Sequence, residues 1–277
     1  MVSLGARRTT AREDSSMNNF GTKEQLKEMH LSVMAKEFAA QLNDPNTYST
    51  MGFEDRFGLL VDAEWNQRKA NKLARRIRDA HFSIPSACME EIDYSVERKL
   101  DRTQLARFGT GQFIDDQNHI IIKGPTGGGK TYLGCAIGNA ACRRMKSVRY
   151  TRMVELLDEL VIARAENQFP KVIAAYSRVD LLILDDWLIR CLSEQETYDL
   201  LEIVESRTKH GATIFCTQYE KEGWYHRINP DNKEDSPIAD AIMDRIVSNA
   251  YVVNITADVS MREHYGRAAL AKDGGSH

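Results

Sequence analysis

Residues 124–131 restrict the possible folds of this chain more than any other segment. They read G-P-T-G-G-G-K-T and follow directly on the apolar run H-I-I-I-K at residues 119–123. This order fits G-x-x-x-x-G-K-[ST], a loop between a strand and a helix whose backbone N–H groups surround nucleotide phosphates. The alternative is a glycine-rich turn that merely ends in Lys-Thr, and the order of strand, loop and helix disfavours it.

The residue types in this loop suit nucleotide binding. Its glycines can adopt positive φ and lack a Cβ that would hold the phosphates away. Lys130 would lie near the β- and γ-phosphates, and the Thr131 hydroxyl would bind Mg²⁺. The residues expected to contact the nucleotide are Gly124, Pro125, Thr126, Gly127, Gly128, Gly129, Lys130, Thr131 and Tyr132.

A second motif lies at residues 179–186, which read V-D-L-L-I-L-D-D. A continuous apolar run of this length is typical of a buried central strand of a parallel sheet. We predict that Asp185 holds Mg²⁺ and that Asp186 polarises the attacking water. The alternative is a buried strand that ends in two solvated acids, and the upstream phosphate loop favours the magnesium role.

Strand and helix patterns alternate from residue 118 onward, which predicts a parallel α/β sheet with helices on both faces. The nucleotide then belongs at the carboxyl ends of the strands. Strands are expected at residues 120–123, 148–150, 181–184, 213–217 and 251–255, and helices at 131–144, 153–166, 171–177, 194–209 and 238–248.

The part before the sheet reads as helices. Thr22 is expected to cap a first helix, which the cluster at residues 43–46 ends. A second helix is expected to begin near Phe53 and to continue or restart through Leu73 and Ile77. The expected divisions are a disordered tail (1–21), a helical domain (22–85), a connecting region (86–117), the nucleotide-binding core (118–267) and a flexible tail (268–277). Residues 220–237 are expected to form a long charged loop.

The net charge of −3 over 277 residues gives no bulk attraction to nucleic acid. Two local stretches contain basic residues and no acid, so each could contact DNA phosphates. A solvated helix face is the alternative for both. The first stretch contains Arg68, Lys69, Lys72, Arg75, Arg76 and Arg78, and the second contains Arg143, Arg144, Lys146, Arg149 and Arg152.

The five cysteines show no C-x-x-C spacing, so Cys135 and Cys142 are interpreted as packing residues. Free thiols fit a cytoplasmic location. The sequence shows no apolar stretch of the roughly 18 residues that a membrane span needs, and no signal peptide is recognised at the N-terminus.

Taken together, these motifs resemble those of the IstB-like ATPases, which are helper proteins of bacterial insertion-sequence transposition. That family is related to the DnaC-type helicase loaders within the AAA+ class. The resemblance covers residues 23–267. Besides the two core motifs, it rests on F-E-D-R at 53–56, D-A-E-W at 62–65, L-A-R-R at 73–76, C-T-Q at 216–218, A-D-A-I-M-D-R at 239–245 and S-M-R at 260–262.

The resemblance implies further site residues. Gln218 matches the polar sensor of the γ-phosphate, with Thr217 as its competitor. Arg245 matches the arginine inserted into a neighbouring subunit's site, and the alternative is a helix-surface arginine paired with Asp244. Arg262 matches a second sensor of the nucleotide. Arg207 is a further basic candidate at the subunit interface.

The resemblance also implies a function: an ATPase with ATP and Mg²⁺ as cofactors that forms homo-oligomers on duplex DNA and assists a transposase. A DnaC-type helicase loader, a small-molecule P-loop kinase and a non-hydrolysing nucleotide switch are the alternatives. The chain departs from the family pattern at Leu188, where glycine is common, and at Asp186, where AAA+ enzymes more often have glutamate. Because the shorter carboxylate of Asp186 reaches less far, we expect slow hydrolysis. The chain stops soon after Arg262, so we also expect a reduced or absent C-terminal lid.

Overall fold

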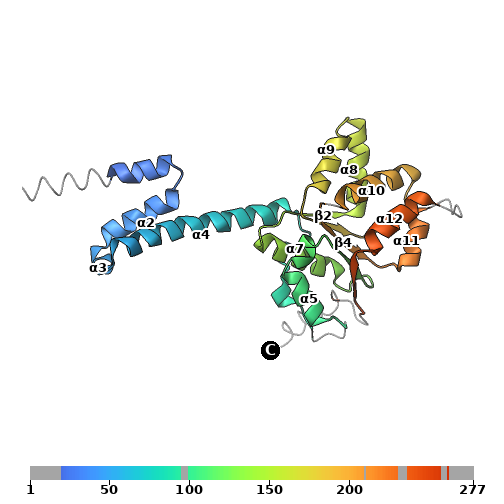
Figure 1. Cartoon of the computed structure of the whole chain (residues 1–277), viewed down its shortest axis with the longest axis horizontal. Coiled ribbons are helices and arrows are strands. Elements are labelled where there is room, and N and C mark those ends of the chain that lie inside the picture. The colour runs from blue at the N-terminus through green and yellow to red at the C-terminus, as the bar shows by residue number, and fades with distance from the viewer. Residues whose placement is uncertain (1–19, 95–98, 209, 230–235, 257–260, 262–277) are drawn as a thin grey trace, which may run out of the picture. The chain divides into compact units, whose positions relative to one another are not determined.

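The computed structural model describes residues 20–94, 99–208, 210–229, 236–256 and 261 (Figure 1). It divides into two compact units, Met1–Ala74 and Arg75–His277. The division falls inside one long helix, and each unit is described by itself. No helix in these ranges combines the length and the hydropathy that crossing a membrane requires.

The first unit is helical. Residues 20–28 form a helix, followed by α2 (Ser32–Asn43), α3 (Pro45–Tyr48) and α4 (Phe53–Asp79). The first helix already includes residue 20, so Thr22 is not its N-cap. A turn with His30 at a φ of 58° separates that helix from α2, and the apolar pattern that we assigned to one helix therefore spans two.

A side chain of α4 caps α2. Glu64 accepts hydrogen bonds from the backbone N–H groups of Val33 (3.0 Å) and Met34 (3.1 Å), and its other oxygen accepts one from Arg68 Nε (2.7 Å). The first N–H groups of a helix have no partner within the helix. A carboxylate is a favourable partner for them, and these contacts fix α2 against α4.

The second unit contains a five-stranded sheet in which every pairing is parallel. The strands lie in the order β2-β3-β4-β1-β5. Their bounds are β1 (His119–Lys123), β2 (Val148–Arg152), β3 (Leu181–Asp185), β4 (Ala212–Thr217) and β5 (Ala250–Asn254). The three central strands are almost wholly buried, as their apolar sequences require. The predicted parallel α/β fold is confirmed.

Helices cover both faces of the sheet (Figure 1). On one face α7 (Lys130–Arg143) packs closely enough for Gly134 to approach Ile183 and Cys216. On the other face Leu182, Leu184 and Phe215 form a core with side chains from the remaining helices. These helices are α8 (Met153–Ala165), α9 (Phe169–Ser177), α10 (Glu194–Arg207), α11 (Lys221–Ile228) and α12 (Pro237–Val247).

The predicted strands and helices of the core match the observed ones to within two residues at each end. Two segments differ. The expected loop at 220–237 contains α11, whose Trp224 is fully buried beside Trp187 and Phe215. The expected connecting region contains the 3₁₀ helix η1 (Met89–Glu91) and the helices α5 (Arg102–Gly109) and α6 (Gln112–Asp115).

The segment after α4, residues 80–88, packs against the sheet and α7 of the second unit. Tyr150 of β2 donates its N–H to the Ala80 carbonyl at 2.8 Å. Asn139 of α7 donates to the carbonyls of Pro85 (2.8 Å) and Ala87 (2.7 Å). Buried backbone carbonyls need such partners, so these bonds hold the segment over the start of the nucleotide-binding core.

Candidate nucleotide-binding site

A cleft of about 920 Å³ opens at the carboxyl ends of the strands. The loop after β1, the end of β3 and the end of β4 all contribute to its lining. Of the residues assigned from sequence, Thr126, Gly127, Gly129, Lys130, Thr131, Tyr132, Asp185, Asp186, Thr217 and Gln218 line it. A cleft in this position is where open parallel sheets bind their ligands.

The backbone of the phosphate loop requires its glycines. Gly127 and Gly129 have φ angles of 77° and 90°, in the left-handed region that favours glycine. A Cβ on Gly124 would come within 2.8 Å of the Ile255 carbonyl oxygen. Gly129 is also the N-cap of α7, so the free N–H groups at the start of that helix face the loop, an arrangement that attracts anions.

Lys130 lies over this loop. Its Nζ donates hydrogen bonds to the carbonyls of Gly124 (3.0 Å) and Pro125 (2.9 Å). Burial lowers the pKa of Lys130, and the carboxylates of Asp185 and Asp186 oppose that shift. The ammonium group is therefore positioned where a phosphate would bind between the loop and the acids.

The two residues assigned to Mg²⁺ touch each other. Thr131 Oγ1 donates to Asp185 Oδ2 at 2.7 Å, and the Tyr150 hydroxyl donates to the same oxygen at 2.8 Å. Hydroxyl and carboxylate oxygens are ligands that Mg²⁺ accepts. The donor set therefore fits the ion. Tyr150, whose pKa is raised by burial, was not assigned to the site from sequence, although it ends a predicted strand.

Asp186 points to a different partner. Its Oδ2 accepts hydrogen bonds from Arg152 Nε (2.9 Å) and Nη2 (2.8 Å), and this contact raises the pKa of Arg152. Sequence reasoning placed Arg152 in a DNA-contacting stretch, whereas the structure places it in the lining of the cleft. Asp186 itself has a φ of 52°, a conformation that aspartate tolerates better than most residues.

The two candidates for the γ-phosphate sensor differ in their contacts. The Gln218 side chain accepts a hydrogen bond from Thr126 Oγ1 in the phosphate loop at 3.0 Å. The Thr217 hydroxyl is buried and donates to the Trp187 carbonyl at 3.1 Å. Gln218 therefore contacts the phosphate loop directly, whereas the Thr217 hydroxyl is already hydrogen-bonded to the Trp187 carbonyl.

Of the three arginines suggested by the family resemblance, the structure describes Arg245 and Arg207. Arg245 of α12 donates to Glu205 of α10 at 2.7 Å and to the Ala241 carbonyl at 3.0 Å, so its partner is Glu205 and not Asp244. It is absent from the lining of the cleft. Arg262 lies outside the described residues.

The expectation that Arg207 lies at a subunit interface is wrong. Its side chain is almost fully buried, and it donates to the carbonyls of Tyr176 (2.6 Å), Val179 (3.0 Å) and Ala212. Burial lowers its pKa to about 10. The guanidinium group donates to carbonyls at the end of α9, between α9 and β3, and at the start of β4, and its burial keeps it from contacting a neighbouring molecule.

Most residues of the two basic stretches have hydrogen-bond or ion-pair partners, some within the same helix and others distant in the sequence. In the first unit Arg68 bonds Glu64 and the His30 carbonyl, while Lys69 and Lys72 are exposed. In the second unit the partners are acids or carbonyls. Arg75 pairs with Asp79, Arg143 with Glu90 and Lys146 with Asp115, and Arg144 donates to the Gly109 carbonyl.

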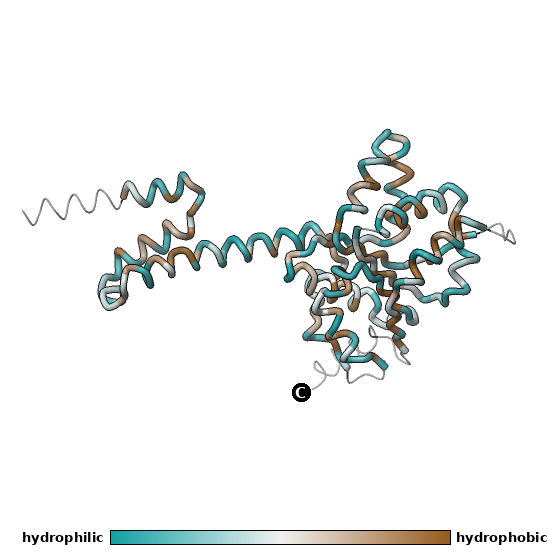
Figure 2. Tube along the Cα trace, viewed as in Figure 1, coloured by the Kyte–Doolittle hydropathy of each residue, from teal (hydrophilic) through white to brown (hydrophobic). Residues whose placement is uncertain are grey.

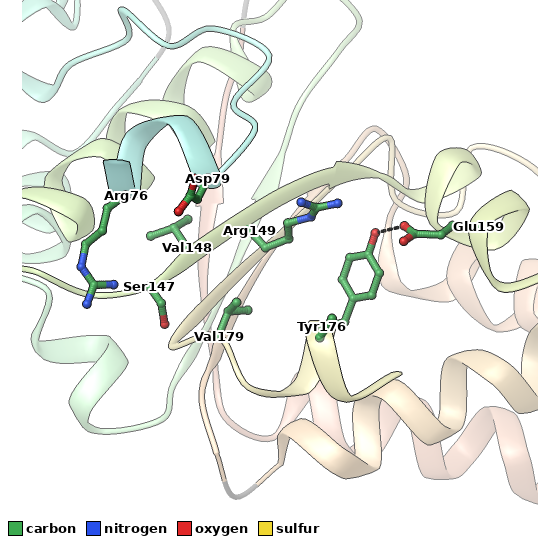
Figure 3. A pocket seen from close by; sticks show the side chains of 9 residues that line it. Arg76, Asp79, Ser147, Val148, Arg149, Glu159, Tyr176 and Val179 are labelled. Carbon is green, nitrogen blue, oxygen red and sulfur yellow. Dashed lines mark hydrogen bonds between the residues drawn. The ribbon is translucent and has the colours of Figure 1, made fainter. Parts of the chain in front are cut away.

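Two further basic residues line a smaller pocket of about 300 Å³ at the other end of β2 (Figure 3). Arg149 and Arg76 point in different directions in this view, and Arg149 extends toward the Tyr176 ring, which its guanidinium carbon approaches to 5.7 Å of the centroid. Tyr176 in turn donates its hydroxyl hydrogen to Glu159 at 2.5 Å. These two arginines therefore do not form one basic surface.

The cysteines of α7 face the interior. Cys135 and Cys142 are fully buried, and burial raises the pKa of each thiol to about 11. A thiol with a raised pKa is a weak nucleophile and a weak ligand, so packing accounts for both.

The strand order, the phosphate loop after β1 and the acids after β3 define the class: an α/β P-loop protein whose core has an AAA+-like fold. The model of one family, described as IstB-like ATP binding protein, matches residues 24–269. The chain belongs to that family.

Individual relatives agree with this placement. An insertion sequence ATP-binding protein of Sinorhizobium fredii is 36% identical over 250 residues, which cover 89% of this chain and 97% of the relative. The ATP-binding protein of insertion sequence IS1162 from Pseudomonas fluorescens is 36% identical over 197 residues, or 71% and 85% of the two chains. The crystal structure of DnaI has the same core fold, with a TM-score of 0.53 and 24% identity over 62% of this chain and 92% of that one.

Proposed function

We propose that this protein is an ATPase that hydrolyses ATP to ADP and phosphate, assembles on duplex DNA when ATP is bound, and assists a transposase. The contact between Thr131 of the phosphate loop and Asp185 of β3 carries the nucleotide part of the proposal. The transposition part rests on family membership over both units and on the names of the relatives, which belong to insertion sequences.

The residues of the cleft divide the chemistry among them. Lys130 and the N-terminus of α7 bind the phosphates, and Thr131 and Asp185 hold Mg²⁺, which when bound offsets the phosphate charge. Gln218 orients the attacking water, and Asp186 polarises it. Because Asp186 is shorter than glutamate and is paired with Arg152, hydrolysis is slow.

Assembly places ATP between subunits. Arg245 lies outside its own cleft and is part-exposed, so its guanidinium is available to stabilise the γ-phosphate in a neighbour's cleft. DNA contacts through exposed lysines such as Lys69 and Lys72 bind the backbone with little base specificity. Hydrolysis then loosens the assembly.

The first test is the Lys130→Ala variant, assayed for binding to duplex DNA with ATP, with ADP and without nucleotide. We expect ATP-dependent binding to be lost, because the charge that holds the phosphates is gone. Lys123→Ala is the matched control, since Lys123 pairs with Glu220 and does not line the cleft. Normal ATP-dependent binding by Lys130→Ala would contradict the proposal.

Two further measurements separate the alternatives. Phosphate release with and without DNA distinguishes an ATPase from a switch that binds ATP and does not hydrolyse it. A preference for single-stranded over duplex DNA would favour a helicase loader.

A further inference from the structure

The proposed chemistry of the cleft makes no use of Tyr150, although this residue touches the magnesium site directly. Its hydroxyl donates to Asp185 Oδ2 at 2.8 Å, and the same oxygen accepts a hydrogen bond from Thr131 Oγ1 at 2.7 Å. Tyr150 and Asp185 are both buried, with 6% and 4% of their surfaces exposed. Breaking a hydrogen bond between buried groups is costly, because little water is present to replace the lost partner.

The register of the sheet brings these two residues together. Tyr150 of β2 is paired with Ile183 of β3, and Asp185 follows Ile183 by two residues. Side chains two apart in a strand lie on the same face of the sheet, and Ile183 lies on the face that α7 covers. Figure 2 shows hydrophobic colouring in the strands at the middle of the second unit. The hydroxyl and the carboxylate therefore meet at the edge of an apolar core.

The backbone of Tyr150 is held on both sides. Its N–H donates to the Ala80 carbonyl at 2.8 Å, and on the other edge β2 pairs with β3. The ring is therefore attached to a fixed strand, and its burial limits how far it can turn. Such a side chain can deliver its hydroxyl to one fixed place.

The orientation of Asp185 depends on the groups that donate to it. The torsion that turns a carboxylate is broad, so hydrogen bonds decide where its two oxygens point. Oδ1 accepts from the Asp186 N–H at 3.0 Å, and Oδ2 accepts from the two hydroxyls. Without the Tyr150 hydroxyl, Oδ2 would keep the bond from Thr131 and lose the one that comes from the sheet.

The orientation of Thr131 depends on Asp185 in turn. A hydroxyl has one hydrogen and two lone pairs, and Thr131 gives its hydrogen to Asp185. Its lone pairs therefore point away from the carboxylate and are available to a cation. Because the position of Asp185 decides where Thr131 presents its oxygen, the Tyr150 hydroxyl affects both proposed ligands of Mg²⁺.

We infer that Tyr150 is a positioning residue of the magnesium site. Its hydroxyl fixes the Asp185 carboxylate, and through it the Thr131 hydroxyl, in the arrangement that binds Mg²⁺. The inference rests on the magnesium role proposed above for these two ligands. Losing a hydrogen-bond partner of a metal ligand lowers metal affinity by about 10- to 100-fold. Phenylalanine would fill the same space as Tyr150 and donate no hydrogen bond.

The Tyr150→Phe variant of the full chain tests the inference. Calorimetry measures the binding of a non-hydrolysable ATP analogue, first in EDTA and then at increasing Mg²⁺ concentration. In EDTA we expect the affinity of the unaltered chain, because Lys130 and the phosphate loop are intact. The Mg²⁺ concentration that gives half of the magnesium-dependent gain in affinity should rise by about 10-fold or more. Phosphate release should need the same increase and should recover at high Mg²⁺.

Tyr176→Phe is the matched control. Tyr176 is also buried, and its hydroxyl donates to the Glu159 carboxylate at 2.5 Å in the smaller pocket. This substitution removes a comparable hydrogen bond and should leave the Mg²⁺ dependence unchanged. Asp185→Asn shows whether Tyr150 acts through Asp185. Adding Tyr150→Phe to that variant should weaken Mg²⁺ binding no further.

Three results would overturn the inference. One is an equal Mg²⁺ dependence in the unaltered chain and in Tyr150→Phe. Another is an equal change in Tyr150→Phe and Tyr176→Phe, which would make general loosening of the fold the cause. The third is weaker binding of the analogue in EDTA, which would show that Tyr150 supports the cleft as a whole. If the unaltered chain bound the analogue equally with and without Mg²⁺, the proposed magnesium role itself would be wrong, and the inference with it.

Discussion

Leu188 combines two properties that rarely coincide. Its φ of 53° lies in the left-handed region, and its side chain is fully buried. This is the position where the family resemblance predicts glycine. A leucine at this angle is strained by about 1 kcal/mol or more, and the burial of its side chain compensates for the strain.

At Leu188 the glycine variant is expected to be more stable than the alanine variant, which is the reverse of the usual order. Leu188→Ala should cost about 2–5 kcal/mol of unfolding free energy, because it leaves a cavity and keeps the strain. Leu188→Gly should be more stable than the alanine variant by about 1 kcal/mol, because it removes the strain. Urea unfolding measures both. Leu184, in the middle of β3, is the control position, where Leu184→Ala should be more stable than Leu184→Gly. If the alanine variant were more stable than the glycine variant at Leu188 as well, this account would be contradicted.

His119 makes the folded state sensitive to acid. Its Nδ1 accepts a hydrogen bond from the Thr213 N–H at 3.1 Å, and burial, reinforced by the charge of Arg207, lowers its pKa from 6.5 to about 4. The unfolded chain therefore binds a proton at this residue at a higher pH than the folded chain does. The stability that neutral His119 contributes is complete above pH 6.5 and is lost as the pH falls toward 4.

The expected loss is about 3 kcal/mol over that range. His119→Asn can accept the same hydrogen bond and does not titrate, so its unfolding free energy should depend less on pH between 6.5 and 4. Denaturant unfolding at a series of pH values compares the two proteins. If the unfolding free energy fell equally with pH in both proteins, groups other than His119 would determine the acid sensitivity.

At the scale of elements, Arg207 joins the end of α10 to the ends of α9 and β4. Arg207→Met would leave several buried carbonyls without donors and should cost at least about 3 kcal/mol. Arg207→Lys should recover only part of this, because one ammonium group cannot replace the planar donor set. Thermal unfolding measures the loss. Undiminished stability with loss of self-assembly would instead place Arg207 at an interface.

The same elements show what the sequence can predict. Strands β1 and β3, the phosphate loop and α7 follow from runs of neighbouring residues, so their positions were predicted to within two residues. The helix α11 was missed because it is short and is held by Trp224 packing against Trp187 and Phe215, which are distant in sequence.

Within the site, too, features set by neighbouring residues could be predicted, and features set by contacts between distant residues could not. The spacing of the motifs identified Lys130, Thr131 and Asp185 as candidates, and the structure brings them to one cleft. Spacing could not reveal that Arg152 pairs with Asp186 or that Arg207 is buried, since both depend on contacts between separate strands and helices.

At the scale of the whole molecule, Arg245 tests whether the active unit is one chain or two. Its ion pair with Glu205 is part-exposed, and such pairs contribute less than about 1 kcal/mol to stability. We expect Arg245→Ala to abolish phosphate release while ATP binding and stability remain close to those of the unaltered chain. Glu205→Ala breaks the same ion pair but keeps the guanidinium, so it is the matched control and should still release phosphate.

Mixing two inactive variants then decides where Arg245 acts. Lys130→Ala lacks a working cleft and keeps Arg245, while Arg245→Ala keeps the cleft and lacks the arginine. If the guanidinium acts on a neighbour's ATP, mixed assemblies contain interfaces with both groups, so phosphate release returns in the mixture and in neither protein alone. If Arg245 acts within its own chain, no mixed interface is complete, because each subunit lacks one of the two groups. Recovery on mixing therefore requires ATP to be hydrolysed between subunits, and its absence would refute the bridged arrangement.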